Sequence, residues 1–155
     1  MDDHLARLTQ LATEAAANIL TPLGFSFELQ TEPYEEGISL MISSPDARFL
    51  IGDEGDRLDD LQYLINRLVQ VQWEEAPRIR VDCDNYRLRA EEKLLRRAHS
   101  RAERVLQTGK TLQMEKLNAY QRRLVHNALA ESPGIRTVSE ETDSRFKRIT
   151  ISRCE

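Results

Sequence analysis

The segment NAYQRRLVHNAL, residues 118–129, carries an arginine and a histidine, Arg122 and His126, at a spacing suited to a binding surface. Residues four apart lie on one face of an α-helix. A guanidinium can fork onto two phosphate oxygens, and an imidazole beside it can donate to phosphate or stack on a base. Arg123 adds a neighbouring cation. An isolated Arg-x-x-x-His match also occurs on ordinary solvated helix faces, so the surroundings must decide between the two interpretations.

Two further groups of cations accompany this segment. The first recurs along a predicted helix and consists of Arg89, Lys93, Arg97 and Arg101, with Arg96 and Arg104 alongside. This stripe extends about 18 Å at roughly 1.5 Å per residue. Two interpretations explain this stripe of cations equally well: a phosphate-binding surface, or a solvated helix face with ion pairs inside the helix. The second group lies near the carboxyl terminus and would join Arg122 and His126 if the terminal strands pack beside their helix: Arg136, Arg145, Lys147 and Arg148.

A glycine pair, Gly52 and Gly55, stands in LIGDEGDRLDDLQYLINRLV, residues 50–69, with Asp53 and Glu54 between the two glycines. The outline is that of a phosphate-binding loop, but the loop is acidic. A unit negative charge about 4 Å from a phosphate repels it by roughly 1 kcal/mol in water. A surface helix terminus offers an anion only about 0.3 to 1 kcal/mol. The other interpretation is a turn between two helices, whose acids favour a helix amino terminus.

Catalytic and metal-binding patterns are missing from the sequence. His4, His99 and His126 lack metal-ligand spacing, the acids do not match a calcium loop, and no nucleophile turn or Walker-type loop occurs. We therefore expect no catalytic residue, no metal and no cofactor, and we expect His126 to bind and position. Cys83 and Cys154 are expected to be two reduced thiols.

The formal net charge of −4 conceals two opposite halves. Residues 1–77 hold 4 basic and 15 acidic residues, a net of −11, whereas residues 78–155 hold 18 basic and 11 acidic residues, a net of +7. A basic half favours a polyanion, and an acidic half favours a basic partner. No apolar stretch approaches the roughly 20 residues needed to span a bilayer, and the start MDDHLARLTQ is unlike a signal peptide. A cytoplasmic protein without membrane insertion is expected.

Hydrophobic periodicity predicts the elements that would position these residues. Residues 2–21 read as an amphipathic helix, residues 25–30 and 38–42 as two strands joined by the turn TEPYEEG, residues 46–51 as a helical turn, and residues 79–83 as a strand. The helix after the glycine loop has a predicted core stripe of Leu58, Leu61, Leu64, Ile65, Leu68 and Val69. The predicted order is helix, strand, strand, helix, helix, strand.

The second half begins with a predicted helix over residues 85–107. Its inner face is assigned to Leu88, Leu94, Leu95, Ala98, Ala102, Val105 and Leu106. A short strand follows at residues 111–114, and Asn118 with Gln121 forms a capping-box signature for a helix through Ala130. Strands over residues 135–139 and 146–152, joined by the turn EETDS, end the chain.

A glycine pair between two helices in this element order resembles a KH domain of type II topology (α-β-β-α-α-β), over residues 1–84. Residues 85–155 resemble, nearly end to end, the small α+β domain named R-3-H for its arginine and histidine. Together they resemble the bacterial Jag-type proteins, in which the two domains are fused. The resemblance implies an α+β fold and the following nucleic-acid-binding residues: Arg122, His126, Arg123, Arg97, Arg101, Arg145, Arg148, Gly52 and Gly55.

The sequence departs from the family at Asp53-Glu54 and at Glu140-Glu141-Thr142, and both departures weaken phosphate contact. It also lacks the additional amino-terminal segment of many Jag-type proteins, so no function of that segment is expected.

The leading hypothesis is a non-enzymatic protein that binds single-stranded RNA, with single-stranded DNA as another ligand, mainly through the basic half. It would act as a bacterial post-transcriptional regulator or RNA chaperone, with homodimers or heterodimers formed through the KH half. The alternative is an adaptor whose acidic half docks on a basic protein partner. A small nuclease is a third, weaker hypothesis.

Overall fold

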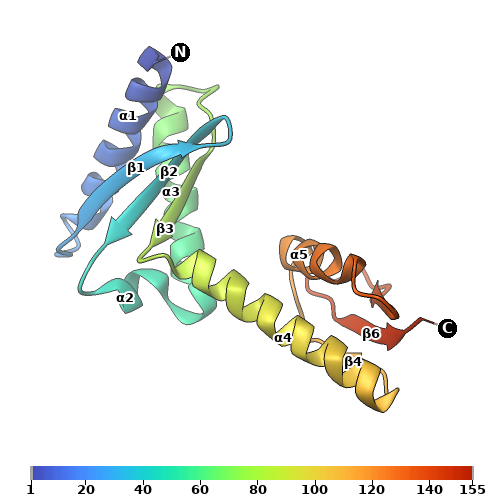
Figure 1. Ribbon diagram of the computed structural model, residues 1–155. Coiled ribbons are helices and arrows are strands. Elements are labelled where there is room, and N and C mark those ends of the chain that lie inside the picture. Colours follow the sequence, from blue (N-terminus) through green and yellow to red (C-terminus); the bar gives the residue numbers. More distant parts are fainter. Residues whose placement is uncertain (1, 155) are drawn as a thin grey trace. The chain divides into compact units, whose positions relative to one another are not determined.

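The computed structural model describes residues 2–154 and divides the chain into two compact units, one ending at Arg87 and the other beginning at Leu88. The first unit holds 7 basic and 17 acidic residues, a net of −10, and the second holds 15 and 9, a net of +6. Both units mix helices and strands (Figure 1). Within the described residues, no helix combines the length and apolar character that crossing a membrane requires.

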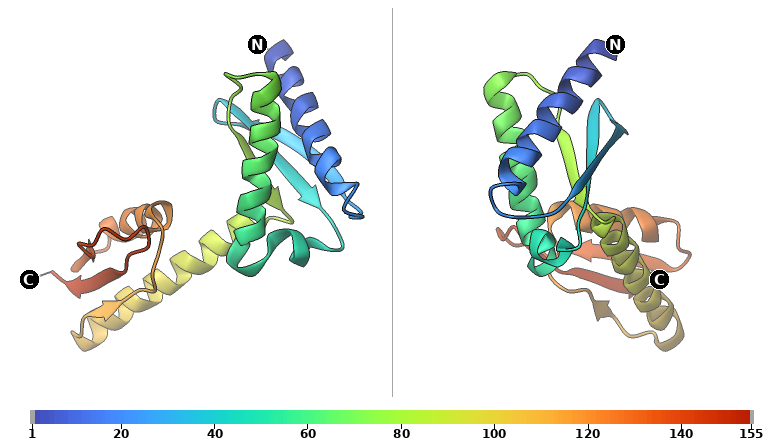
Figure 2. Two further views of the ribbon diagram at one scale, coloured as in Figure 1. Left: turned by 180° about the vertical axis from the view of Figure 1, so that it is seen from behind. Right: turned by 90° about the vertical axis from the view of Figure 1, so that its left-hand side faces the viewer.

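The first unit contains the elements in the predicted order, with one 3₁₀ turn added at the glycine loop. They are α1 (Asp2–Leu20), β1 (Glu28–Tyr34), β2 (Gly37–Ser43), α2 (Ala47–Ile51), the 3₁₀ turn η1 (Asp53–Gly55), α3 (Asp56–Gln72) and β3 (Ile79–Cys83). The sheet order is β1-β2-β3, with β1 antiparallel and β3 parallel to β2. Both α1 and α3 lie against the same face of this sheet (Figure 2).

The core of the first unit forms where the helical and strand periodicities meet. On α1 the buried positions include Leu8, Ala12 and Ala16, and on α3 they are Leu58, Leu61, Ile65 and Val69. The facing strand residues alternate in β3, where Ile79 and Val81 are fully buried. Small alanines on α1 let the helix lie close to the sheet.

Two predictions in this unit are wrong. Leu64 and Leu68 were assigned to the core of α3 but are 48% and 41% exposed. The buried stripe is narrower than predicted because a helix that packs on one sheet face buries only about 100° of its circumference. The segment TEPY is also strand and not turn, since β1 begins at Glu28 and continues through Pro33 to Tyr34. A proline is tolerated there because β1 is an edge strand.

Side chains occupy the edge of β3 that faces away from β2. Asn66 on α3 donates to the carbonyl of Ile79 (2.8 Å) and accepts from its N–H (2.9 Å). Gln62, one turn earlier, accepts from the N–H of Val81 (2.9 Å). The remaining carbonyl, that of Val81, accepts from Arg87 Nε (2.8 Å). The outward backbone groups of Ile79 and Val81 are therefore all hydrogen-bonded without a further strand.

Arg87 also explains where the first unit ends. Its Nη1 lies 2.7 Å from Asp59 Oδ1, and its backbone N–H donates to the buried Asp82 carboxylate. Asp84 and Asn85 have positive φ (48° and 56°) and form the turn before α4 (Tyr86–Thr108). The boundary thus lies three residues after the predicted one, because the first turn of α4 packs in the first unit.

The second unit contains most of α4, then β4 (Leu112–Gln113), α5 (Ala119–Ala130), β5 (Ile135–Ser139) and β6 (Ile149–Arg153). Its antiparallel sheet has the order β4-β6-β5. Leu94, Ala98 and Val105 of α4 and Val125 and Leu129 of α5 share one core with Ile149 and Ile151. Leu88 and Leu106 were predicted on the inner face but are 52% and 37% exposed.

Replacing Asn66 with alanine tests the link between α3 and β3. The substitution leaves the N–H and carbonyl of the fully buried Ile79 without partners, and each such group costs about 1 to 3 kcal/mol. We expect Asn66→Ala to lower the free energy of unfolding by about 2 kcal/mol or more in urea denaturation. The control Asn127→Ala, at an exposed position of α5, should stay within about 0.5 kcal/mol. Equal losses of unfolding free energy in the two variants would contradict a stabilising role for the hydrogen bonds between Asn66 and Ile79.

Candidate nucleic-acid interface

The helix that carries Arg122 and His126 is fixed at its amino terminus by a complete capping box. The side chain of Asn118 accepts from the N–H of Gln121 (2.9 Å), and the Gln121 side chain accepts from the N–H of Asn118 (3.0 Å). This confirms the predicted cap. It defines where α5 begins, so the residues one and two turns later have fixed directions.

The ring of His126 is bound on both nitrogens by hydroxyls of β5. Nδ1 lies 2.6 Å from Thr137 Oγ1, and Nε2 lies 2.9 Å from Ser139 Oγ. A neutral ring donates through one nitrogen and accepts through the other, and a hydroxyl can serve either role. The apolar pattern of the helix predicts that His126 projects outside the core, and in the structure its half-buried ring lies against β5. The ring joins α5 to β5, and its nitrogens can reach a phosphate only if these bonds are broken.

The ring of His126 is also held uncharged. Its partial burial and, secondarily, the positive charge of Arg122 lower the pKa of His126 below its ordinary value of 6.5. The hydroxyl partners do not cause this shift, because they could accept from both nitrogens of a protonated ring. At neutral pH the cationic character of this face therefore comes from arginine.

Arg122 is held by backbone carbonyls. Its Nη1 donates to Leu117 O at 2.7 Å and, more weakly, to Arg145 O at 3.4 Å. The guanidinium thereby connects the start of α5 to the loop between β5 and β6. A guanidinium has five N–H donors, so donors remain for a ligand while the side chain is fixed in place.

The other cations of this region differ in how they are held. Arg123 is exposed on α5. The Arg145 guanidinium lies 5.6 Å from the Phe146 ring centroid, in the range of a cation–π contact. Arg148 has an exposed side chain, and its backbone N–H donates to Glu140 Oε2 (3.0 Å). Glu140 thus closes the β5–β6 hairpin and places a carboxylate among these cations.

Arg97 and Arg101 belong to a different part of the second unit. Both lie on α4 and share one carboxylate, that of Glu115, which is 2.6 Å from Arg97 Nη2 and 3.8 Å from Arg101 Nη1. Glu115 Oε1 is buried, and its close approach to Arg97 lacks hydrogen-bond geometry. An open groove between α4 and β4 contains both arginines.

Gly52 and Gly55 lie in the first unit, in the turn between α2 and α3. Both have positive φ, 73° and 83°. A Cβ at Gly52 would overlap the side chains of Asp56 and Arg57, and a Cβ at Gly55 would lie 2.7 Å from the Tyr86 ring. Both glycines are therefore required by contacts inside the chain, whether or not a nucleic acid approaches.

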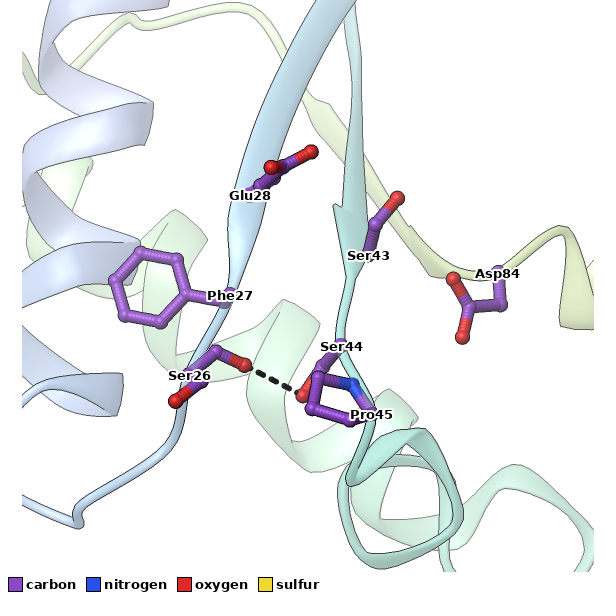
Figure 3. A pocket seen from close by; sticks show the side chains of 7 residues that line it. All are labelled: Ser26, Phe27, Glu28, Ser43, Ser44, Pro45 and Asp84. Atoms are coloured by element: carbon purple, nitrogen blue, oxygen red, sulfur yellow. Dashed lines mark hydrogen bonds between the residues drawn. The ribbon is translucent and has the colours of Figure 1, made fainter.

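The charge around this loop is unfavourable to phosphate. Asp53 and Glu54 are exposed, and Glu54 adopts a left-handed conformation with φ 51°. Burial and then the carboxylates of Glu54 and Asp59 raise the pKa of Tyr86 above its ordinary value. A hollow elsewhere in the unit is lined by serines and by Glu28 and Asp84, with Ser44 donating to the carbonyl of Ser26 (Figure 3). It too carries carboxylates and no cation.

The candidate residues thus fall into three groups. Arg122, Arg123 and His126 lie on α5, with Arg145 and Arg148 in the β5–β6 hairpin. Arg97 and Arg101 lie along α4, and the glycine loop belongs to the first unit. Three residues that contribute to these sites were not predicted: Thr137, Ser139 and Glu115. Thr137 and Ser139 follow Ile135 at a spacing of two, which places polar side chains on the core-facing side of β5. That pattern is a detectable signal for a buried polar partner.

Comparison with known proteins finds a domain family that resembles most of the second unit. Residues 92–153 match the family model of the R-3-H domain. The chain is 29% identical to RNA-binding protein KhpB of Clostridium symbiosum over 147 residues, which cover 94% of this chain and 66% of the relative. It is 32% identical to RNA-binding protein KhpB of Bacillus subtilis (strain 168) over 89 residues, 57% of this chain and 43% of the relative. The protein of that name from Lactiplantibacillus plantarum is 27% identical over 125 residues, 81% of this chain and 39% of the relative. The matched regions thus span 39% to 66% of the length of these relatives.

A pair of glycine substitutions separates backbone strain from the contact with Tyr86. Gly24 and Gly55 both have positive φ (81° and 83°), but a Cβ at Gly24 meets nothing within 4 Å. We expect Gly24→Ala to cost about 1 kcal/mol from the left-handed conformation alone. Gly55→Ala should cost at least about 1 kcal/mol more because of overlap with Tyr86. Urea denaturation of both variants measures the difference, and equal losses would exclude a packing role for Gly55.

The lowered pKa of His126 predicts a pH dependence of stability. Between the folded pKa and 6.5 the unfolded chain binds more protons than the folded chain, so stability is retained above pH 6.5 and falls as the pH is lowered below it. We expect His126→Gln to show a smaller loss of unfolding free energy between about pH 7.5 and 5.5. His99→Gln, at an exposed position of α4, is the control and should follow the parent. An NMR titration midpoint for His126 at or above 6.5 would contradict the prediction.

Proposed function

We propose that the chain is a member of the bacterial Jag-type R-3-H proteins and that it is a non-enzymatic protein that binds single-stranded RNA mainly through residues 88–155. The observation that carries the proposal is the grouping of Arg122, Arg123 and Arg145 beside a hydrogen-bonded His126 in a unit of net charge +6. The relatives' name, RNA-binding protein, supports RNA over other polyanions.

In this proposal the residues of α5 have different roles. Arg123 and Arg145 supply exposed cations that neutralise backbone phosphates, and Arg122 offers donors from a fixed position. His126 keeps α5 on the sheet and presents an uncharged ring to sugars or bases. Contacts to phosphates and sugars and stacking on bases do not read base edges, which suits a post-transcriptional regulator or an RNA chaperone acting in the cytoplasm.

We assign the first unit to the type II KH topology as part of the same proposal. The assignment is supported by the order α-β-β-α-α-β and by the glycine pair between α2 and α3. The acidic loop and the net charge of −10 argue against a grip on RNA by this unit. They favour the second candidate function, in which the first unit docks on a basic protein. Formation of homodimers or heterodimers through this unit stays a prediction from the resemblance.

The proposal is tested by removing two cations near His126 in the full chain. On a single strand, each cation that no longer neutralises a phosphate lowers the salt slope of the binding constant by about 0.7. We expect Arg123→Gln with Arg145→Gln to bind a fluorescent oligouridylate about tenfold more weakly at about 0.1 M salt, with a slope lower by about 1.4. Fluorescence anisotropy measures both quantities.

The matched control removes the same charge from the first unit, by Arg67→Gln with Arg78→Gln, two exposed positions. It should bind RNA nearly as the parent does. If the parent chain does not bind the oligomer at all, the RNA-binding proposal is wrong and docking of a basic protein becomes the leading function. If control and test variants lose affinity equally, the Arg122–His126 region is not the site.

A further inference from the structure

We propose that the groove between α4 and β4 is a second site for the phosphate backbone of single-stranded RNA, separate from the region around Arg122 and His126. The inference rests on the proposed function and extends it by adding a binding surface. The groove is lined by five cations of α4, and β4 contributes the facing residues Leu112 and Gln113. The cations are Lys93, Arg96, Arg97, Arg101 and Arg104.

The helix geometry aligns these cations along one side of α4. Lys93, Arg97, Arg101 and Arg104 follow one another at spacings of four, four and three residues, and Arg96 lies three residues after Lys93, while Leu94, Ala98 and Val105 are buried in the core. From Lys93 to Arg104 the row extends about 16 Å at roughly 1.5 Å per residue. A polyanion that follows the groove therefore meets cations in succession, whereas a small anion would use only one or two.

The ion pairs within the groove leave most of its charge uncompensated. Glu115 is shared between Arg97 and Arg101, and Glu92 lies 3.9 Å from Arg96 in an exposed pair. Two carboxylates thus face five cations, a net of +3. Among the described residues, Lys93 and Arg104 have no carboxylate within ion-pair distance. Exposed ion pairs are worth about 0 to 1 kcal/mol, so a phosphate can compete with Glu92 for Arg96 at little cost.

The remaining walls suit a nucleic-acid strand. Ser100 and Gln113 line the groove and supply neutral hydrogen-bonding groups, and Leu112 offers a half-buried apolar surface to a sugar or base. Glu115 fixes the guanidinium of Arg97, which reduces the entropy lost when that side chain binds a ligand.

The topology separates this groove from the first site. His126 bonds to β5, whereas the groove is formed at β4, and β6 lies between these two strands in the sheet. The strand that holds His126 and the strand that lines the groove are therefore not neighbours in the sheet of this unit. A short oligomer can occupy one of the two cationic surfaces, and a longer strand gains affinity by reaching both.

The test removes the cations at the two ends of the groove in the full chain, by Lys93→Gln with Arg104→Gln. The probes are labelled oligouridylates of about 6 and about 16 nucleotides, which bracket common single-strand site sizes. We expect about a tenfold loss of affinity for the longer probe at about 0.1 M salt and a salt slope lower by about 1.4. The advantage of the longer probe over the shorter one should shrink.

Two control variants show whether a loss of RNA affinity comes from the cations of the groove or from the change in net charge. Arg67→Gln with Arg78→Gln removes equal charge from the first unit and should leave affinity and slope near those of the parent. The charge-retaining pair Lys93→Arg with Arg104→Lys should bind as the parent does. Circular dichroism melting checks folding, and if the double variant is destabilised, Lys93→Gln alone should lower the slope by about 0.7.

The groove is excluded if its variant keeps the affinity, slope and length dependence of the parent while Arg123→Gln with Arg145→Gln loses affinity. In that case the proposed function stands and only the second site is wrong. The groove is also excluded if the control Arg67→Gln with Arg78→Gln loses as much RNA affinity as Lys93→Gln with Arg104→Gln. A parent chain that binds neither probe would overturn the proposed function and this inference together.

Discussion

The hydrogen bonds between the His126 ring and the two hydroxyls of β5 are the interaction on which the arrangement of the second unit's α5 surface depends. They join the middle of α5 to Thr137 and Ser139 and thereby fix the rotation of the helix over the sheet. The capping box fixes its beginning, and Arg122 fixes the adjoining loop through the carbonyls of Leu117 and Arg145. The arginine and histidine that name the domain are thus part of its structure as well as of its surface. Loss of either side chain would alter the interface through the fold, even where it makes no contact with a ligand.

The two units have opposite net charges, −10 and +6, and their charged residues are arranged differently. In the second unit, Glu115 pairs with the guanidinium groups of Arg97 and Arg101, and Glu140 accepts from the backbone N–H of Arg148. In the first unit, burial and then the carboxylates of Glu54, Asp59 and Asp53 raise the pKa of the Tyr86 phenol, which lies beside the glycine loop. A loop with the outline of a phosphate site therefore sits in a negative field, and its glycines are explained by the side chains of Asp56, Arg57 and Tyr86. The Gly52–Gly55 loop thus has the glycine pair of a phosphate-binding loop but carries the wrong charge for phosphate.

The elements were predictable because their signals are local. The capping box at Asn118, the short strand after Gly109 and the strand from Ile135 to Ser139 follow from spacing and turn residues, and the structure contains them. The failures concern tertiary choices. Whether Leu64 or Leu88 is buried depends on how wide a face its helix packs, which periodicity alone does not determine. The partners of His126 and of Arg97 lie 11 to 18 residues away in sequence, on strands and loops whose register is set by the whole domain.

The side chains that cover β3 have a consequence for growth of the first sheet. Because Asn66, Gln62 and Arg87 already bond the outward groups of Ile79 and Val81, an incoming strand finds no vacant partners on that side. The sheet could be lengthened only along β1, where Pro33 lacks an N–H and interrupts any new ladder. At the β3 edge, side-chain amides and a guanidinium already bond the outward backbone groups. At the β1 edge, Pro33 has no N–H to donate. A domain built this way resists stacking into extended ribbons during synthesis and at high concentration.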